Sequence, residues 1–208
     1  MTKMFNALAI TGVLLLSQAV LAQNVSIRGV RLSGSGCDAA TASAVTTADG
    51  KTLSVLFDNY IAEIGQGSAN PQLTSLKKDC HVLIDVDVPF GYQDALNQTE
   101  YRGFAALPKS AYGLHRFTQI IPGAPVASMK EAQLFGSLNS NYSVIVSTKP
   151  GREVYSQCNN KFQTIDLFSQ LQLAYLPNTS DRSIAMLNLD TVDTGVNSRF
   201  KLIWRKCK

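Results

Sequence analysis

The sequence has few of the residues from which most catalytic and metal centres are built. It contains two histidines, His81 and His115, and four cysteines among 208 residues. The histidines lack the H-x-H or H-x-x-x-H spacing of metal ligands, and the cysteines lack the closely spaced pairs of zinc sites. A C-x-x-C redox motif and a G-x-S-x-G nucleophile elbow are also missing. We therefore predict no metal, no cofactor and no catalytic residue.

The chain also lacks a large excess of positive or negative charge. The chain carries 19 Lys and Arg against 15 Asp and Glu, a net charge of +4. This weak charge argues against a nucleic-acid partner. The one basic cluster is C-terminal and is interpreted as a solvated edge strand whose lysines discourage pairing, with contact to an anionic envelope polymer as the alternative. Its residues are Lys201, Arg205, Lys206 and Lys208.

The only long apolar run lies at the N-terminus. Residues 7–16 are apolar apart from Thr11 and Gly12, Lys3 precedes them, and residues 20–22 are small or apolar. This pattern is typical of a secretory signal peptide. We predict a signal peptide over residues 1–22 and a single secreted domain over residues 23–208, with no membrane span after cleavage. The localisation is extracellular, or periplasmic in a Gram-negative cell.

Secretion takes the cysteines into an oxidising compartment, where they form disulfides. Four cysteines, Cys37, Cys80, Cys158 and Cys207, allow three pairings. We favour Cys37–Cys80 and Cys158–Cys207, one bridge in each half of the chain. Each closes a loop of roughly 45 residues and contributes on the order of 4 kcal/mol to stability by the loop-entropy estimate.

Alternating apolar and polar positions separated by turn residues predict strands. Leu53, Val55 and Phe57 share one face of a strand that follows the turn residues Asp49-Gly50. In residues 79–88, every second side chain is apolar. Further strands are predicted over residues 26–32, 98–107, 113–121, 142–147, 164–175, 182–190 and 199–207. Two stretches, 58–64 and 126–135, are predicted as helical.

About ten short strands with Gly, Pro, Asn and Asp between them predict an all-β fold. We expect an antiparallel β-sandwich, Greek-key or jelly-roll-like, with disulfide staples.

One segment carries the candidate binding residues. In Tyr101-Arg102-Gly103-Phe104 an arginine lies between aromatic residues, an arrangement that can stack on a sugar or clamp a carboxylate. Tyr92 lies nearby in the sequence and adds a second aromatic platform. The predicted partner is a polysaccharide or a cell-envelope polymer. The favoured interpretation of the aromatic side chains places them in the core, and the binding platform is the alternative.

Three carboxylates are the candidates for chemistry. Asp85 and Asp87 share one strand face, and with Asp58 on an adjacent strand they could bind calcium or act as an acid/base pair. The favoured interpretation is a solvated outer sheet face, in which Arg102 pairs with Asp85 or Asp87.

Several patches, taken in order, resemble the uncharacterised secreted family called domain of unknown function 4360. The chain departs from the family pattern at Asp38, where proline is frequent, and at residues 114–117, where an aromatic pair is frequent. The resemblance implies a secreted β-rich domain with paired cysteines and implies no reaction. The matching patches are Gly34-Ser35-Gly36-Cys37, Asp49-Gly50 with residues 53–57, Lys77-Lys78-Asp79-Cys80, Pro89-Phe90-Gly91-Tyr92, Tyr101-Arg102-Gly103-Phe104-Ala105, Ser156-Gln157-Cys158 and residues 202–207.

The sequence therefore favours a non-enzymatic binding or surface-associated module. A secreted hydrolase of glycan or peptide that uses the strand carboxylates is one alternative. A secreted inhibitor or effector is the other.

Overall fold

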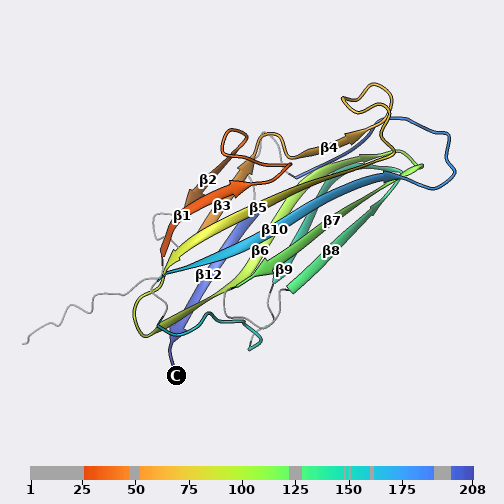
Figure 1. Cartoon of the computed structure of the whole chain (residues 1–208). Coiled ribbons are helices and arrows are strands. Elements are labelled where there is room, and N and C mark those ends of the chain that lie inside the picture. The colour runs from red at the N-terminus through yellow and green to blue at the C-terminus, as the bar shows by residue number, and fades with distance from the viewer. Residues whose placement is uncertain are drawn as a thin grey trace, which may run out of the picture.

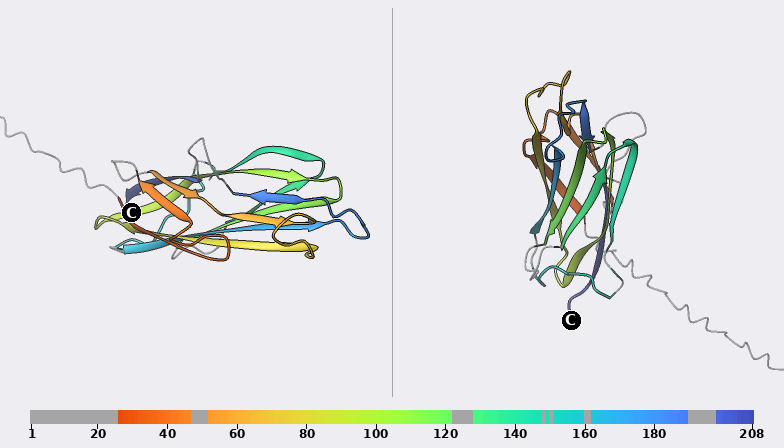
Figure 2. Two further views of the ribbon diagram at one scale, coloured as in Figure 1. Left: turned by 90° about the horizontal axis from the view of Figure 1, so that it is seen from above. Right: turned by 90° about the vertical axis from the view of Figure 1, so that its right-hand side faces the viewer.

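The protein consists of two antiparallel sheets packed face to face (Figures 1 and 2). The computed structural model describes residues 26–46, 52–121, 128–147, 149, 151–159, 162–189 and 198–208. Within these residues there are twelve strands and no helix. The predicted signal peptide and the turn Asp49-Gly50 lie outside the described residues.

The first sheet has five strands in the order β1-β5-β10-β7-β8. They are β1 (Ser26–Ser33), β5 (Ser75–Asp87), β10 (Phe162–Tyr175), β7 (Ala111–Ile120) and β8 (Ser128–Phe135). Since β1 and β8 are the two edge strands of this order, only β5, β10 and β7 are paired on both sides.

The second sheet has seven strands and is built around β6, which pairs with β12, β11 and β9. Its members are β2 (Ala42–Thr46), β3 (Thr52–Phe57), β12 (Ser198–Lys206), β6 (Tyr92–Leu107), β11 (Ala185–Asn188), β4 (Ile61–Ile64) and β9 (Leu138–Ser147). The basic C-terminal segment was predicted as an edge strand. In the described residues β12 pairs with both β3 and β6 over residues 199–201, whereas residues 202–206, which include Arg205, pair with β6 alone, so the prediction is wrong for the first part of the strand only.

Strand alternation places the core between the sheets, as predicted. Leu53, Val55 and Phe57 are buried, and so are Val82 and Ile84 on β5. The intervening side chains of β5 face outward and are half-buried. An apolar side chain at every second position is therefore enough to define the inner face of each of these strands.

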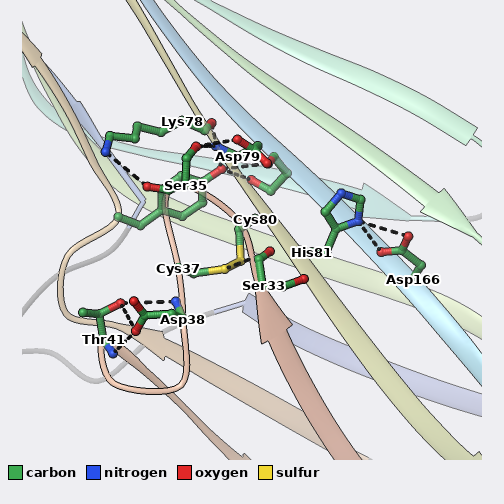
Figure 3. The surroundings of a disulfide bond; sticks show 12 residues. Ser33, Ser35, Cys37, Asp38, Thr41, Lys78, Asp79, Cys80, His81 and Asp166 are labelled. Carbon is green, nitrogen blue, oxygen red and sulfur yellow. Dashed lines mark hydrogen bonds and ion pairs between the residues drawn. A yellow bond between two sulfur atoms is a disulfide. The ribbon is translucent and has the colours of Figure 1, made fainter.

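Both predicted disulfides are present. Cys37 of the β1–β2 loop is bonded to Cys80 of β5, with the Cα atoms 5.4 Å apart (Figure 3). Cys158, before β10, is bonded to Cys207 at the end of β12, with the Cα atoms 5.8 Å apart. Both cysteine pairs link segments far apart in the sequence.

The two predicted helices are wrong. Residues 61–64 form β4, which pairs with β11 through Ala185 and Asn188. Residues 128–135 form β8, an edge strand on β7, while 126–127 lie outside the described residues. Residues 129–134 contain Lys, Glu, Ala, Gln and Leu, which are good helix formers, but the free edge of β7 offers backbone partners that override propensity.

Candidate functional site

A cleft lies near the end of β5. The C-terminus lies at this same end of the sandwich (Figure 1), and the Cys207 amide is hydrogen-bonded to Gly91 in the turn after β5. The cleft has a volume of about 640 Å³ and lies among the end of β5, the turn that follows it and the beginning of β10. We call it the end cleft. Its walls include two aromatic, one basic, one acidic and one amide side chain, namely Phe90, Phe162, Arg28, Asp87 and Asn159.

The two phenylalanine rings of the end cleft are exposed. Phe90 has 83% of its surface accessible and Phe162 has 53%. Phe90 lies in the turn after β5, which is closed by a 3.0 Å hydrogen bond from the Tyr92 amide to the Pro89 carbonyl. Burying a phenylalanine side chain contributes roughly 2 kcal/mol, so stability does not explain two exposed rings. Exposed apolar faces at one place are typical of a binding surface.

Arg28 enters the end cleft because β1 is irregular. The pairing of β1 with β5 shifts between Ile27 and Gly29, so Arg28 is an extra residue of a β-bulge. A bulge re-aims its side chain. The Arg28 Cζ atom lies 4.9 Å from the centroid of the Phe162 ring, a cation–π contact between the first and third strands of the sheet. The contact places guanidinium donors beside an aromatic face.

Asp87 adds an acceptor to the same place. Asp87 and Phe162 are Cα partners across β5 and β10, so their side chains lie side by side. The Oδ1 atom of Asp87 is buried and has no hydrogen-bond partner in the described part of the chain. Because Asp87 lines the end cleft and is only half-buried, its carboxylate group can accept a hydrogen bond from a ligand hydroxyl group.

The second disulfide holds two walls of the end cleft together. Cys158, which precedes Asn159, is bonded to Cys207, and the Cys207 amide donates a 2.7 Å hydrogen bond to the Gly91 carbonyl in the Phe90 turn. The Ser156 hydroxyl donates a 2.6 Å hydrogen bond to the Asp94 carboxylate at the beginning of β6. Burial raises the pKa of this carboxyl. These contacts fix the Asn159 segment relative to the Phe90 turn.

The binding residues predicted from the sequence do not form one site. Tyr101 is buried in the core, with its ring centroid 4.1 Å from that of Phe117, so a ligand cannot reach it. Arg102 points to the opposite face, where its Nε donates a 2.6 Å hydrogen bond to Glu100 rather than pairing with Asp85 or Asp87. Phe104 is half-buried.

Tyr92 lies at the other end of β6 from this group. Ten residues separate it from Arg102, roughly 30 Å along a strand. The aromatic platform predicted on β6 is thus divided between the core, one sheet face and the sandwich end.

The three candidate carboxylates, Asp58, Asp85 and Asp87, do not lie together in one site either. Asp58 follows β3 in the seven-stranded sheet, whereas Asp85 and Asp87 lie on β5 of the other sheet, so the expected adjacency is wrong. Asp85 accepts hydrogen bonds from Arg31 at 3.0 Å and from the Thr164 hydroxyl at 2.6 Å. The interpretation of Asp85 and Asp87 as an outer-face pair is the one that agrees with their positions.

His115 belongs to a polar network in the interior that sequence reasoning missed. Its Nδ1 lies 3.1 Å from the Tyr142 hydroxyl and its Nε2 lies 2.8 Å from the Ser169 hydroxyl. Tyr142 donates its hydrogen to the Asn188 carbonyl at 2.8 Å, so His115 donates from Nδ1 and accepts from Ser169 at Nε2.

The burial of His115 lowers its pKa well below the ordinary value of 6.5. The imidazole is therefore neutral, and a substrate cannot reach Ser169 in the core.

His81, in contrast, lies on the outer face of β5. Its Nδ1 is 3.2 Å from both carboxylate oxygens of Asp166 (Figure 3). The ring of His81 also packs against Phe168. No group of three or more potential metal-ligating His, Cys, Asp or Glu side chains occurs in the described part of the chain.

These features define a disulfide-bonded, all-β protein of two packed antiparallel sheets. The chain belongs to the family described as Domain of unknown function (DUF4360), which matches residues 23–207. An "Uncharacterized secreted protein" of Arthroderma benhamiae is 27% identical over 184 residues, which are 88% of this chain and 72% of the relative. The secreted localisation predicted from the sequence is thereby supported, and the two disulfides are consistent with it.

Among solved structures, a partial likeness is found to TmCBM61 in complex with β-1,4-galactotriose. The TM-score is 0.36 and the sequence identity 11%, over 86% of this chain and 90% of that chain. At this level the likeness supports no conclusion about this chain. Among the residues that the structure describes, no helix is long and apolar enough to cross a membrane.

Proposed function

We propose that this chain is a secreted, non-enzymatic binding module for a polysaccharide or another cell-envelope polymer, and that the end cleft is its ligand site. The observation that carries the proposal is the exposed pair Phe90 and Phe162 beside Arg28. The face of an aromatic ring matches the apolar face of a pyranose ring. Planar polar side chains beside it can hydrogen-bond to the hydroxyl groups.

Arg28, Asp87 and Asn159 supply these polar partners. Arg28 only donates, an ionised Asp87 only accepts, and Asn159 does both, so the end cleft can satisfy hydroxyl groups in either role. Because the walls are held by the Cys158–Cys207 bridge, little ordering is required when a ligand binds.

A depletion assay tests the proposal. The oxidised protein is mixed with insoluble polysaccharides and isolated cell envelopes, and the protein left in solution is measured. We expect depletion by at least one polymer, and roughly tenfold weaker binding by Phe90→Ala and by Phe162→Ala, a loss of about 1.4 kcal/mol. Phe135→Ala is the matched control, because Phe135 is 64% exposed but lies on the opposite edge strand β8.

Arg102→Ala tests the site predicted from the sequence. If Arg102→Ala loses binding while Phe90→Ala retains it, the ligand site lies on β6 and not in the end cleft. If no polymer depletes the protein, the proposed function is wrong.

A further inference from the structure

A second hollow lies along the first strand, next to the end cleft. A groove of about 550 Å³ lies between β1 and the segment that leads into β2. Residues 27–32 line it from one side, and Ala39, Ala42 and Ala44 from the other. Arg28 lines both the groove and the end cleft, so the two hollows meet at this side chain. We call this groove the edge groove.

The edge groove is bordered by strand edges. In the described residues β1 pairs with β5 alone and β2 pairs with β3 alone, so each strand has one unpaired edge. An unpaired edge presents backbone N–H and C=O groups that can bind polar groups. Six residues of β1 correspond to roughly 20 Å of such edge. The end cleft and edge groove together therefore form an elongated track.

The charges along this track are balanced. In the end cleft the cation Arg28 is accompanied by Asp87. Arg31 of the edge groove is paired at 3.0 Å with Asp85, which does not itself line the groove but offsets the Arg31 charge. A polyanionic chain would meet the Asp87 carboxylate and an already paired Arg31, and a polycationic chain would meet both guanidinium groups. A neutral chain rich in hydroxyl groups can use the donors and the acceptors together.

We infer that the ligand is the interior of a neutral, linear polysaccharide, which lies along the end cleft and the edge groove with Arg28 at the junction. This inference rests on the proposed function and adds the ligand class and the mode of binding. An elongated surface track accepts the middle of a chain, whereas a closed pocket accepts a chain end. Binding along the track predicts that affinity increases with chain length until both hollows are filled.

The first test is a titration with oligosaccharides prepared from the neutral polymer that depletes the protein, from disaccharide to octasaccharide. Affinity is expected to increase at least tenfold over this series. The second test blocks the edge groove with Ala44→Phe. Affinity for the octasaccharide is expected to fall about tenfold, while affinity for the disaccharide, held by the end cleft, is unchanged.

Three further variants complete the test. Ser43→Phe is the matched control, because Ser43 is exposed on the same strand but does not line the edge groove. Ala39→Phe blocks the edge groove from the loop before β2 and replaces Ala44→Phe if that variant does not fold. Phe90→Ala is expected to weaken the binding of short and long ligands alike.

Different failures have different meanings. Length-independent affinity, or full octasaccharide binding by both blocked variants, overturns this inference and leaves the end cleft as a site for short ligands. Depletion only by a uronate polymer or other polyanion overturns the neutral ligand class. Capture of an extended peptide instead of any polysaccharide overturns both the inference and the proposed function.

Discussion

The backbone amide of Cys207 donates a 2.7 Å hydrogen bond to the carbonyl of Gly91. This contact joins the last cysteine of the chain to the turn that carries Phe90. Because Cys207 is also bonded to Cys158, next to Asn159, one bridge holds both the turn and the opposite wall of the end cleft. The Cys37–Cys80 bridge lies elsewhere, between the β1–β2 loop and β5.

The two bridges should therefore differ in their effect on binding. They span similar separations of 43 and 49 residues, so removing either as a double Cys→Ser change is expected to cost on the order of 4 kcal/mol. Removal of Cys158–Cys207 should also abolish polymer depletion where the protein is still folded, and removal of Cys37–Cys80 should not. Denaturant unfolding and the depletion assay measure the two effects. Equal binding by both folded variants would contradict the role assigned to the second bridge.

Thiol content provides a simpler check of the same bonds. The secreted protein, denatured without reductant, is expected to show no reactive thiol, since all four cysteines are paired. Labelling that finds two or four thiols would contradict the pairing.

Two buried tyrosines should respond in opposite ways to removal of the hydroxyl group. Tyr101 has a buried hydroxyl without a hydrogen-bond partner in the described residues, whereas Tyr60 donates a 2.7 Å hydrogen bond to the Ser169 carbonyl. Tyr101→Phe is expected to leave the free energy of unfolding unchanged or higher. Tyr60→Phe should lower it by about 1–2 kcal/mol. Chemical denaturation measures both, and a large loss for Tyr101→Phe would reveal an unseen partner.

Gly103 should tolerate no side chain. A Cβ atom at this position would lie 2.1 Å from the backbone carbonyl oxygen of Asn188, which is far inside contact distance. Gly103→Ala is expected to cost about 3 kcal/mol, because the backbone of β11 must shift. Gly29→Ala is the control on β1, where the nearest atom would be 3.9 Å away. Similar melting temperatures for the two variants would refute this steric argument.

Stability should decrease in mild acid because of His115. Its folded-state pKa is held well below 6.5 by burial, so the unfolded chain binds a proton that the folded chain does not. The neutral imidazole keeps its full contribution above about pH 6.5, and that contribution is lost as the pH falls toward the folded-state pKa. The expected slope is about 1.4 kcal/mol per pH unit below pH 6.5.

Unfolding by urea at a series of pH values measures this slope. His115→Gln should remove it, and His81→Asn, which changes the other histidine of the chain, should retain it. A slope that survives His115→Gln would assign the acid sensitivity to other groups.

Much of the fold was predictable, because alternation along a strand is a local property. Val82 and Ile84 had to share a face, and that face had to be the buried one. The helix predictions failed for the opposite reason. Residues 128–135 have a helix-forming composition. They form a strand because they pair with the free edge of β7, and this pairing cannot be derived from the propensity of the residues themselves.

The candidate site was less predictable than the fold. Phe90 was visible in the sequence as one aromatic residue among several, but Phe162 and Arg28 were not singled out. Their meeting depends on the β1-β5-β10 order and on one bulge, and neither is encoded in the spacing of residues. Tyr101 and Arg102 illustrate the same limit, because successive strand residues point to opposite faces and cannot serve one surface site.

The sequence by itself determined the secreted character, the all-β class, the bridged cysteines and the inner face of the main strands. These follow from composition, local periodicity and the redox state of the compartment, which do not depend on how strands are arranged. Only the tertiary structure decided which strands are neighbours, and therefore which side chains meet in the end cleft. Arg28, Asp87 and Phe162 come from three strands far apart in the chain, and the pairing of these strands together with the bulge at Arg28 brings them together.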